Sequence, residues 1–342
     1  MKAAQFSEFG EPLEIVDLPA PDPPDGGAVI EVKAAGLCRS DWHGWQGHDP
    51  DITSLPHVPG HEFSGTVAAV GRGVSGWREG DRITVPFVCG CGRCDQCASG
   101  NTQVCPHQYQ PGFSGPGAFA EFVAVPEAAT NLVSLPDEVD FAAAASLGCR
   151  FATAYRGLAH PDQANLQPGE RVAVFGCGGV GLSAVMIASS LGAEVIAIDV
   201  RDSALDAAAS LGASSTRRFD ELDGLSADIT VDALGKSETC LAAIDALNPR
   251  GRHVQIGLMV GADASPTLPV SRMIGKELKF IGSHGMGASR YPEMLERIAS
   301  GHLQPQNLVA ARIGLEDLPA AMLGMSRFSG EPGVTVIEHF GR

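Results

Sequence analysis

The chain has 342 residues, more than one ordinary hydrophobic core accommodates, so we expect two domains. Hydrophobic residues make up 44% and charged residues 19% of it, as in globular proteins, and the formal net charge of −16 argues against a surface that binds nucleic acid. The N-terminus mixes charged with apolar side chains and no stretch approaches about 18 apolar residues, so we expect a cytoplasmic protein without membrane contacts.

The first third of the chain predicts a mainly β domain. Short apolar and β-branched segments alternate there with turns that contain Gly and Pro, and they lie at 28–32, 65–70, 82–85 and 119–125. From Arg171 the pattern changes to alternating strand and helix segments, at 171–175, 180–192, 194–199, 202–212, 228–233, 238–248 and 252–257. Such alternation predicts right-handed βαβ units on a parallel sheet.

The last part of the chain, from about Ser289, has no βαβ rhythm and ends in the strand-like segment 333–340. We expect this part to rejoin the first domain. The predicted organisation is therefore a mainly β domain made of 1–150 and 285–342, and an α/β domain at 151–284.

A glycine-rich segment directly follows the first strand of the α/β part. It runs Gly176, Cys177, Gly178, Gly179, Val180, Gly181, which is the spacing Gly-x-Gly-x-x-Gly at the start of a predicted helix. Glycine at these positions allows a tight turn, a close approach of a pyrophosphate to the backbone and close packing of helix on strand, while the helix N-terminus favours negative charge. The segment predicts a dinucleotide-binding site rather than a plain connector.

The second strand of this unit ends in Asp199. A carboxylate at this place accepts hydrogen bonds from an adenosine ribose and repels a 2′-phosphate, which favours NAD over NADP. Arg201 weakens this preference, because a nearby arginine can bind the phosphate.

Nine cysteines in a chain expected in the cytoplasm indicate metal binding or catalysis rather than disulfides. Cys91, Cys94, Cys97 and Cys105 have the spacing Cys-x2-Cys-x2-Cys-x7-Cys. Four thiolates this close together complete a tetrahedral shell around Zn²⁺ and leave no open position, which is typical of a structural site. An iron–sulfur cluster is the alternative, but the rest of a ferredoxin-like framework is missing. We interpret Cys89, beside the cluster, as a non-ligand.

A second set of candidate ligands is dispersed along the chain. Cys38 lies in GLCRSDWHG, His61 in PGHEFSG and Cys149 in SLGCRFATAY. Two thiolates and one imidazole leave one vertex of a tetrahedron open for water or substrate, as in catalytic zinc sites. Taken singly, each residue is equally well explained by a place in a hydrophobic core.

Together these segments resemble the zinc-containing medium-chain alcohol dehydrogenase family over essentially the whole chain. The resemblance rests on GHE followed by FSGTVAAVG and GDRI, on the four-cysteine segment, on the GC pair ahead of a helix and on the Gly-rich start of the α/β unit, in this order. Alcohol dehydrogenases are also the standard example of a Cys2His zinc site.

The resemblance implies a GroES-like, mainly β catalytic domain joined to a Rossmann domain with a doubly wound parallel sheet. It further implies two zinc ions per chain, one catalytic and one structural, and NAD. The stretch between Cys105 and Cys149 is short, as in the tetrameric microbial branch, so the resemblance implies a homotetramer.

By the same resemblance, Cys38, His61 and Cys149 correspond to the catalytic zinc ligands, and Glu62 to a carboxylate that can approach the metal during ligand exchange. The four clustered cysteines correspond to the structural ligands.

Three residues between the first two ligands correspond to catalytic groups of the family. Ser40 corresponds to the hydroxyl residue that binds the substrate oxygen, Asp41 to the partner of the histidine ligand, and His43 to the end of a proton relay. Asp41 could instead only cap a helix, and His43 could only lie at the surface. We interpret the other eight histidines, including His48 and His57, as structural or surface residues.

The resemblance also assigns residues to cofactor and substrate. The predicted cofactor contacts beyond the Gly-rich segment, Asp199 and Arg201 are Arg39 at the pyrophosphate, Thr153 and Val180 at the nicotinamide, and Leu258; the predicted substrate pocket includes Phe87 and Trp45.

The expected reaction is the reversible oxidation of an alcohol to an aldehyde or ketone. Zinc, as a Lewis acid, stabilises the negative charge on the alcohol oxygen, Ser40 passes the proton through the cofactor ribose toward His43, and the nicotinamide accepts the hydride. Serine where threonine is common leaves space beside the reacting oxygen, so we expect bulky, aromatic or secondary alcohols to fit.

Several alternative functions differ from this one in the residues that they require. Zinc-free quinone or enone reductases of the same fold lack both the dispersed ligands and the four-cysteine segment. Polyol dehydrogenases commonly carry glutamate at the position of Cys149, so they are less favoured. Dehydrogenases of the family that act on threonine or on aldehydes stay open as alternatives. The alternative from another class is a non-catalytic sensing or structural protein that binds NAD and zinc, and the relay of Ser40 and His43 argues against it because binding alone has no use for a relay.

Overall fold

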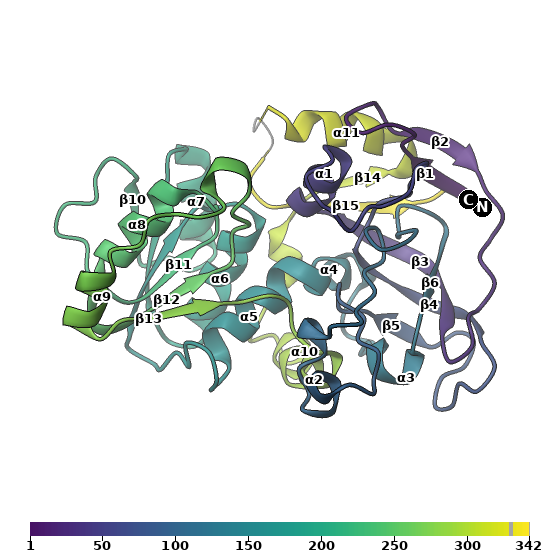
Figure 1. Ribbon diagram of the computed structural model, residues 1–342, viewed down its shortest axis with the longest axis horizontal. Coiled ribbons are helices and arrows are strands. Elements are labelled where there is room, and N and C mark those ends of the chain that lie inside the picture. Colours follow the sequence, from purple (N-terminus) through teal and green to yellow (C-terminus); the bar gives the residue numbers. More distant parts are fainter. Residues whose placement is uncertain (328–330, 342) are drawn as a thin grey trace.

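The computed structural model of the protein describes residues 1–327 and 331–341. These residues form two lobes, each built around one large sheet (Figure 1). The lobe on the left of Figure 1 contains the α/β segments, and the lobe on the right contains the first and the last strands of the chain.

The sheet of the α/β lobe has six strands, all parallel, in the order β10-β9-β8-β11-β12-β13. Its strands are β8 (Arg171–Phe175), β9 (Glu194–Asp199), β10 (Ser215–Arg218), β11 (Ala227–Asp232), β12 (Leu247–Gln255) and β13 (Lys279–Gly282). The helices of this lobe are α6 (Gly179–Ser190), α7 (Asp202–Ser210), α8 (Ser237–Asp245) and α9 (Val270–Lys276).

Strand β8 shows why helices cover both faces of this sheet. Successive strand side chains point to opposite faces, and both faces of β8 are apolar. Val172 and Val174 belong to one core cluster with residues of α6 and α7, whereas Ala173 and Phe175 belong to another that includes Ala243 of α8. The lobe is therefore a doubly wound Rossmann sheet, as predicted.

The strand order reverses between β8 and β11. In open α/β sheets, ligands bind outside the carboxyl ends of the strands at such a switch point. Gly176 to Gly181 follow the end of β8 and lead into α6, so the fold places the Gly-rich segment at the expected cofactor edge.

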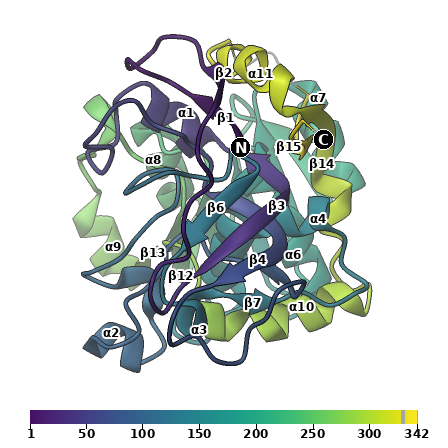
Figure 2. The same ribbon diagram turned by 90° about the vertical axis from the view of Figure 1, so that its right-hand side faces the viewer.

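The other lobe is mainly β. Its sheet has the order β14-β15-β3-β4-β5-β7, with β6 paired to β3. Figure 2 shows the molecule from the side of this lobe, with β3 beside β4. Its strands are β3 (Ala28–Leu37), β4 (Glu62–Val70), β5 (Arg82–Thr84), β6 (Phe122–Val125), β7 (Val133–Ser134), β14 (Val309–Gly314) and β15 (Val334–His339), and a hairpin of β1 (Lys2–Gln5) and β2 (Glu14–Asp17) lies beside it. The predicted GroES-like lobe is confirmed.

The end of the chain lies in this mainly β lobe, because β15 pairs antiparallel with β3. The boundaries at 150/151 and 284/285 stay a prediction. The other helices are α1 (Arg39–Trp45), α2 (Asp95–Ala98), α3 (Ala128–Asn131), α4 (Phe141–Ala145), α5 (Ala152–Ala159), α10 (Tyr291–Ala299) and α11 (Leu318–Met325), with a π-helical turn at Leu147–Phe151. None of the helices in the described ranges is long and apolar enough to cross a membrane.

Several expected elements have different bounds in the structure, and for two of them the cause is local. The segment expected as a helix to residue 248 ends at Asp245, since Pro249 disfavours a helical conformation at Asn248, and β12 begins at Leu247. The strand expected at 119–125 begins only at Phe122, because the backbone of Ala118 and Phe119 bonds to Gly60 and Pro59 instead.

Candidate active site and metal centres

The three dispersed ligand candidates meet at one point of the mainly β lobe. Cys38 follows β3 and precedes α1, His61 precedes β4, and Cys149 lies in the π-helical turn, a feature frequent at functional sites. Their ligand atoms lie within 4.8 Å of one another. Pairing of β3 with β4 brings the first two together, and packing of the turn against β4 supplies the third.

Asp41 orients the imidazole of His61. Its Oδ1 accepts a hydrogen bond from His61 Nδ1 at 2.7 Å and from the Gly60 N–H at 3.2 Å, and its Oδ2 accepts from the Cys38 N–H at 2.9 Å. The two roles considered for Asp41, helix capping and orientation of the histidine, are therefore compatible, because the same carboxylate closes the first turn of α1 and holds His61.

The surroundings of the other ring nitrogen of His61, Nε2, indicate whether these residues fit a metal. Nε2 is buried and has no hydrogen-bond partner among the described residues. With Nδ1 donating to a carboxylate, Nε2 carries a free lone pair beside two sulfur atoms, as in zinc-ligating histidines. The Cys149 thiol, Arg150 and His61 also lower the pKa of Cys38 well below its usual range despite burial, which favours the thiolate a metal needs. The donor set fits zinc.

Glu62 is fully buried beside the triad. Its Oε1 accepts hydrogen bonds from the backbone N–H groups of Cys149 and Arg150, both at 2.9 Å, and its Oε2 pairs with the guanidinium of Arg150. Both carboxylate oxygens are thus bound within the protein. Arg150 was not predicted, although a charged residue in the apolar run around Cys149 is a signal that could have indicated it.

The predicted relay residues lie at the beginning of α1. Ser40 Oγ is 3.9 Å from Cys38 Sγ, so the hydroxyl borders the ligand set. His43 Nδ1 lies 3.1 Å from Nδ1 of His48, a hydrogen-bonded pair that the sequence pattern did not indicate. Burial, Arg39 and His48 lower the pKa of His43 to about 4, so at neutral pH this ring is uncharged.

Arg39 connects α1 to α11. Its Nη1 donates to the carbonyl oxygen of Met325 at 2.5 Å, and its guanidinium lies over the ring of Trp42 at 3.8 Å from the centroid. Trp42 Nε1 donates to Ser326 Oγ at 2.9 Å. The predicted pyrophosphate contact is thus a cation held by an aromatic ring and a carbonyl.

Aromatic rings surround His61. Phe87 makes an edge contact with it at 5.9 Å between centroids, and Phe113 lies at 5.1 Å, while the place of Phe87 in the substrate pocket stays a prediction. His284 makes an edge contact with the other side of Phe87 at 5.0 Å. Phe113 and His284 were not predicted, since they come from loops far away in sequence.

The structure does not support the assignment of Trp45 to the pocket. Its side chain is only 2% exposed in the core cluster of the mainly β lobe, and its Nε1 donates to the carbonyl of Glu11 at 2.5 Å. An aromatic residue near a relay histidine suggested a pocket wall, but its place on α1 turns it inward.

The Gly-rich segment has the geometry that its function requires. Gly176 has φ +88°, a conformation that side chains disfavour, and a Cβ on Gly181 would lie 1.7 Å from the Gly176 carbonyl oxygen. A Cβ on Gly178 would meet nothing within 4 Å, so this glycine borders open space. The segment is a tight turn with one open side at the N-terminus of α6.

Asp199 has a second task besides the predicted ribose contact. Its Oδ2 accepts a hydrogen bond from the Cys177 N–H at 2.8 Å and its Oδ1 from the Arg201 N–H at 2.9 Å. The Arg201 guanidinium lies 3.7 Å from the same carboxylate. Asp199 therefore holds the Gly-rich turn, and the ion pair occupies the arginine that could otherwise meet a phosphate.

The remaining predicted cofactor contacts lie around this edge of the sheet. Thr153 Oγ1 donates to the Cys149 carbonyl at 2.6 Å and accepts from the Gly285 N–H at 3.1 Å, so it joins the π-helical turn to the segment after β13. Val180 is in the first turn of α6 and partly exposed, and Leu258 is half exposed after β12.

The four clustered cysteines come together around α2. The ligand atoms of Cys91, Cys94, Cys97 and Cys105 lie within 4.8 Å of one another, and Asn131 anchors the loop through two hydrogen bonds to Gly90. The backbone N–H groups of Arg93 and Cys94 help to lower the pKa of Cys91 to about 6, which favours the thiolate.

Cys89 lies outside this group. Burial raises its pKa to about 12, so its thiol stays protonated.

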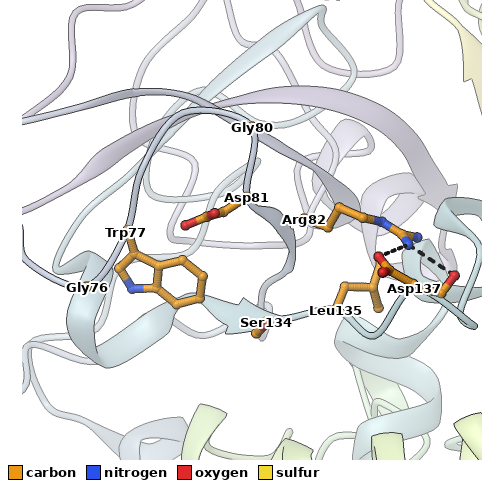
Figure 3. Close-up of a pocket in the computed structure, with 8 residues that line it drawn as sticks. All are labelled: Gly76, Trp77, Gly80, Asp81, Arg82, Ser134, Leu135 and Asp137. Carbon is orange, nitrogen blue, oxygen red and sulfur yellow. Dashed lines mark hydrogen bonds and ion pairs between the residues drawn. The ribbon is translucent and has the colours of Figure 1, made fainter.

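A hollow of about 460 Å³ on the mainly β lobe is unrelated to these sites (Figure 3). It is bordered by Trp77, Asp81 and Ser134, and by Arg82, which donates to Asp137 at 3.1 Å. None of the candidate ligands or cofactor contacts lines it.

Two family models match the chain. Residues 24–137 match the alcohol dehydrogenase GroES-like domain, and residues 179–300 match the zinc-binding dehydrogenase domain. An alcohol dehydrogenase of Geobacillus stearothermophilus is 37% identical over an alignment that spans 62% of this chain and 62% of that protein. An NAD-dependent alcohol dehydrogenase of Sulfurisphaera tokodaii is 31% identical over 96% of this chain and 97% of that protein.

Among solved structures, acetophenone reductase from Geotrichum candidum in complex with NAD superimposes with a TM-score of 0.88 at 27% identity, covering 99% of this chain and 97% of that one. The near full-length relative, the two domain models and a donor set that fits zinc agree with one another. The chain therefore belongs to the zinc-containing medium-chain alcohol dehydrogenase family.

Proposed function

We propose that this protein is a zinc-dependent, NAD-linked alcohol dehydrogenase that interconverts primary or secondary alcohols with aldehydes or ketones. The observation that carries the proposal is the buried, unpaired Nε2 of His61 between two thiols, held by Asp41 in the tautomer a metal requires. Cys38, His61 and Cys149 would hold the catalytic zinc, and the four clustered cysteines the structural zinc.

Bound zinc supplies a Lewis acid that lowers the pKa of the alcohol, and NAD supplies the hydride acceptor. The residues of the chain orient the reactants and move the proton. Ser40, next to Cys38, would accept the hydroxyl proton, and His43 would receive it through the cofactor ribose. His48, paired with His43, would release it toward solvent.

Other residues would place the cofactor and the substrate. Gly176 to Gly181 would hold the pyrophosphate together with Arg39, and Asp199 the adenosine ribose. Thr153, Val180 and Leu258 would border the nicotinamide side, and Phe87 the substrate.

The test is an assay of purified protein with primary, secondary, aliphatic and aromatic alcohols, each with NAD and with NADP, together with the zinc content. We expect about two zinc ions per chain and turnover with NAD. Bound zinc without turnover of any alcohol, aldehyde or ketone would favour the non-catalytic alternative. The likeness to an acetophenone reductase supports including bulky aromatic secondary alcohols.

We further propose that the protein is a homo-oligomer, a tetramer by resemblance. Strand β13 is an edge strand of the six-stranded sheet, and beside it α9 has no buried residue. Val270, Phe280 and Ile274, the last 73% exposed, present apolar side chains there. Exposed apolar edge strands are normally covered. Ile274→Glu should lower the mass measured by light scattering, and an unchanged mass would exclude this face. We place the protein in the cytoplasm, where the nine free thiols would stay reduced.

A further inference from the structure

Arg150 is a buried cation that contacts the segments of all three candidate zinc ligands. Arg150 directly follows Cys149 in the chain. Its Nη1 donates to the Leu37 carbonyl at 2.9 Å, and its Nη2 pairs with Glu62. Leu37 precedes Cys38 in the chain, and Glu62 follows His61. One guanidinium therefore ties together three segments that are far apart in sequence.

The charge of Arg150 also determines where Glu62 lies. Glu62 is fully buried, and a buried carboxylate without a counter-charge is strongly disfavoured. Zinc with two thiolates has no net charge, so the guanidinium is the group that balances Glu62. As long as the pair is formed, both oxygens of Glu62 are occupied within the protein.

The same side chain packs on the cofactor loop. A Cβ on Gly179 would lie 2.8 Å from Cδ of Arg150 and 3.3 Å from its Nη1, so the arginine fills the space that a side chain at this position would need. Nε of Arg150 is buried without a partner among the described residues and would lie 3.6 Å from that Cβ. Arg150 thus spans from the ligand set of one lobe to the Gly-rich turn of the other.

We propose that Arg150 is a positioning residue that couples cofactor binding to retention of the catalytic zinc. This inference rests on the proposed ligand set and cofactor loop. A dinucleotide bound at the Gly-rich turn fixes Gly179, and the fixed turn confines Arg150 against Leu37 and Glu62. Because coupling between two binding sites is reciprocal, cofactor raises the affinity for the catalytic zinc and zinc strengthens cofactor binding. Bound cofactor also slows zinc loss, because the confined Arg150 keeps the ligand segments together.

The experiment measures zinc transfer from the two-zinc holoenzyme to a colorimetric chelator, with and without saturating NAD. The phase from the catalytic site is identified by its absence in His61→Ala. In the unaltered protein we expect NAD to slow this phase several-fold. In Arg150→Met we expect loss without NAD to be roughly 10 to 100 times faster, the usual effect of removing a group that supports metal ligands, and protection by NAD to shrink toward none.

Two further variants keep the test decisive if Arg150→Met does not fold. Arg150→Lys keeps the charge, but a single ammonium cannot reproduce the two-sided contact with Leu37 and Glu62, so an intermediate loss rate and weaker protection are expected. Gly179→Ala places a methyl against Arg150 Cδ, so it should reduce the protection by NAD even at an NAD concentration that titration shows to saturate the variant.

The matched control is Arg252→Met, which removes a partly buried ion pair with Glu170 in the α/β lobe and should leave zinc release unchanged. Zinc release like that of the unaltered protein in all Arg150 variants would overturn the inference. So would faster release with undiminished protection by NAD, because Arg150 would then only support the fold. A purified unaltered protein that lacks a second zinc would overturn the proposed function instead.

Discussion

Replacing Asp41 by Asn tests whether this carboxylate sets the tautomer of His61. Asp41 accepts hydrogen bonds from His61 Nδ1, the Gly60 N–H and the Cys38 N–H. Asparagine has one accepting oxygen and one NH2 group that only donates. The substitution keeps the size of the side chain and changes only which atoms donate.

Neither orientation of the amide satisfies the site. With its oxygen at the place of Oδ1, the NH2 group opposes the Cys38 N–H. With its oxygen at the place of Oδ2, the NH2 group opposes the Gly60 N–H and bonds to His61 only if the imidazole proton moves to Nε2, where it blocks a metal. A buried donor left without an acceptor costs about 1 to 3 kcal/mol. Weakened support of a ligand lowers metal affinity roughly 10- to 100-fold, or about 1.4 to 2.8 kcal/mol.

We therefore expect Asp41→Asn to lower the free energy of unfolding by about 1 to 3 kcal/mol, zinc affinity of the catalytic site about 10- to 100-fold, and kcat/KM in parallel. Denaturant unfolding, competition with a zinc chelator and steady-state kinetics measure these quantities. Asp140→Asn is the matched control, since Asp140 caps α4 by accepting from the Ala143 N–H at 2.6 Å and Asn caps helices equally well.

Two zinc ions per chain, unaltered kcat/KM and unaltered stability in Asp41→Asn would refute this role of the carboxylate. Equal zinc loss in Asp140→Asn and Asp41→Asn would refute it as well, because the effect would then be a general loosening of the lobe.

Four further outcomes are expected. Ser40→Ala should lower kcat by about 10² or more, whereas Ser40→Thr should spare small primary alcohols and penalise bulky or secondary ones by ~1 to 3 kcal/mol; equal slowing of all alcohols in the panel would contradict the steric part. Asp199→Gly should raise the ratio of NADP to NAD use in kcat/KM and, since it frees the Cys177 N–H, weaken NAD binding; a preference of the unaltered enzyme for NADP would refute this. Cys97→Ser should lower the melting temperature and leave about one zinc per chain, and unchanged melting would exclude a structural site there. The pKa of His43 is 6.5 in the unfolded chain and about 4 in the folded protein. Burial, Arg39, His48 and Lys236 lower it, and Cys38 opposes the shift. The unfolded state therefore binds the proton first, stability falls as the pH drops from 6.5 to 4, and His43→Gln should flatten that part of the curve of unfolding free energy against pH; an unchanged slope would contradict the assignment.

The local sites could be predicted from the sequence because their parts lie close together in the chain. Cys91 to Cys105 span one loop, so their spacing alone brings four sulfur atoms within reach of one ion. Gly176 to Gly181 form one turn after a strand, and Gly181 is explained by a contact within that turn, with the carbonyl of Gly176. Periodicity likewise predicted the parallel sheet, since both faces of β8 are apolar.

The dispersed triad needed the resemblance as well as the residues. Cys38, His61 and Cys149 are each unremarkable in their local sequence, and they meet because β3 pairs with β4 and the π-helical turn packs against both. No periodicity specifies which distant strands pair.

Only the tertiary structure determined the groups that surround the ligands. Arg150 reaches Leu37, Glu62 and Gly179 across the boundary of the two lobes, and Trp45 turns into the core. Sequence spacing specifies a contact only within one turn, helix or loop, whereas the partner of a long, buried side chain depends on how separate lobes pack. The residues alone therefore determine the donor atoms of the two metal sites, whereas the packing of the two lobes determines the contacts on which the proposed coupling of the catalytic site to the cofactor loop depends.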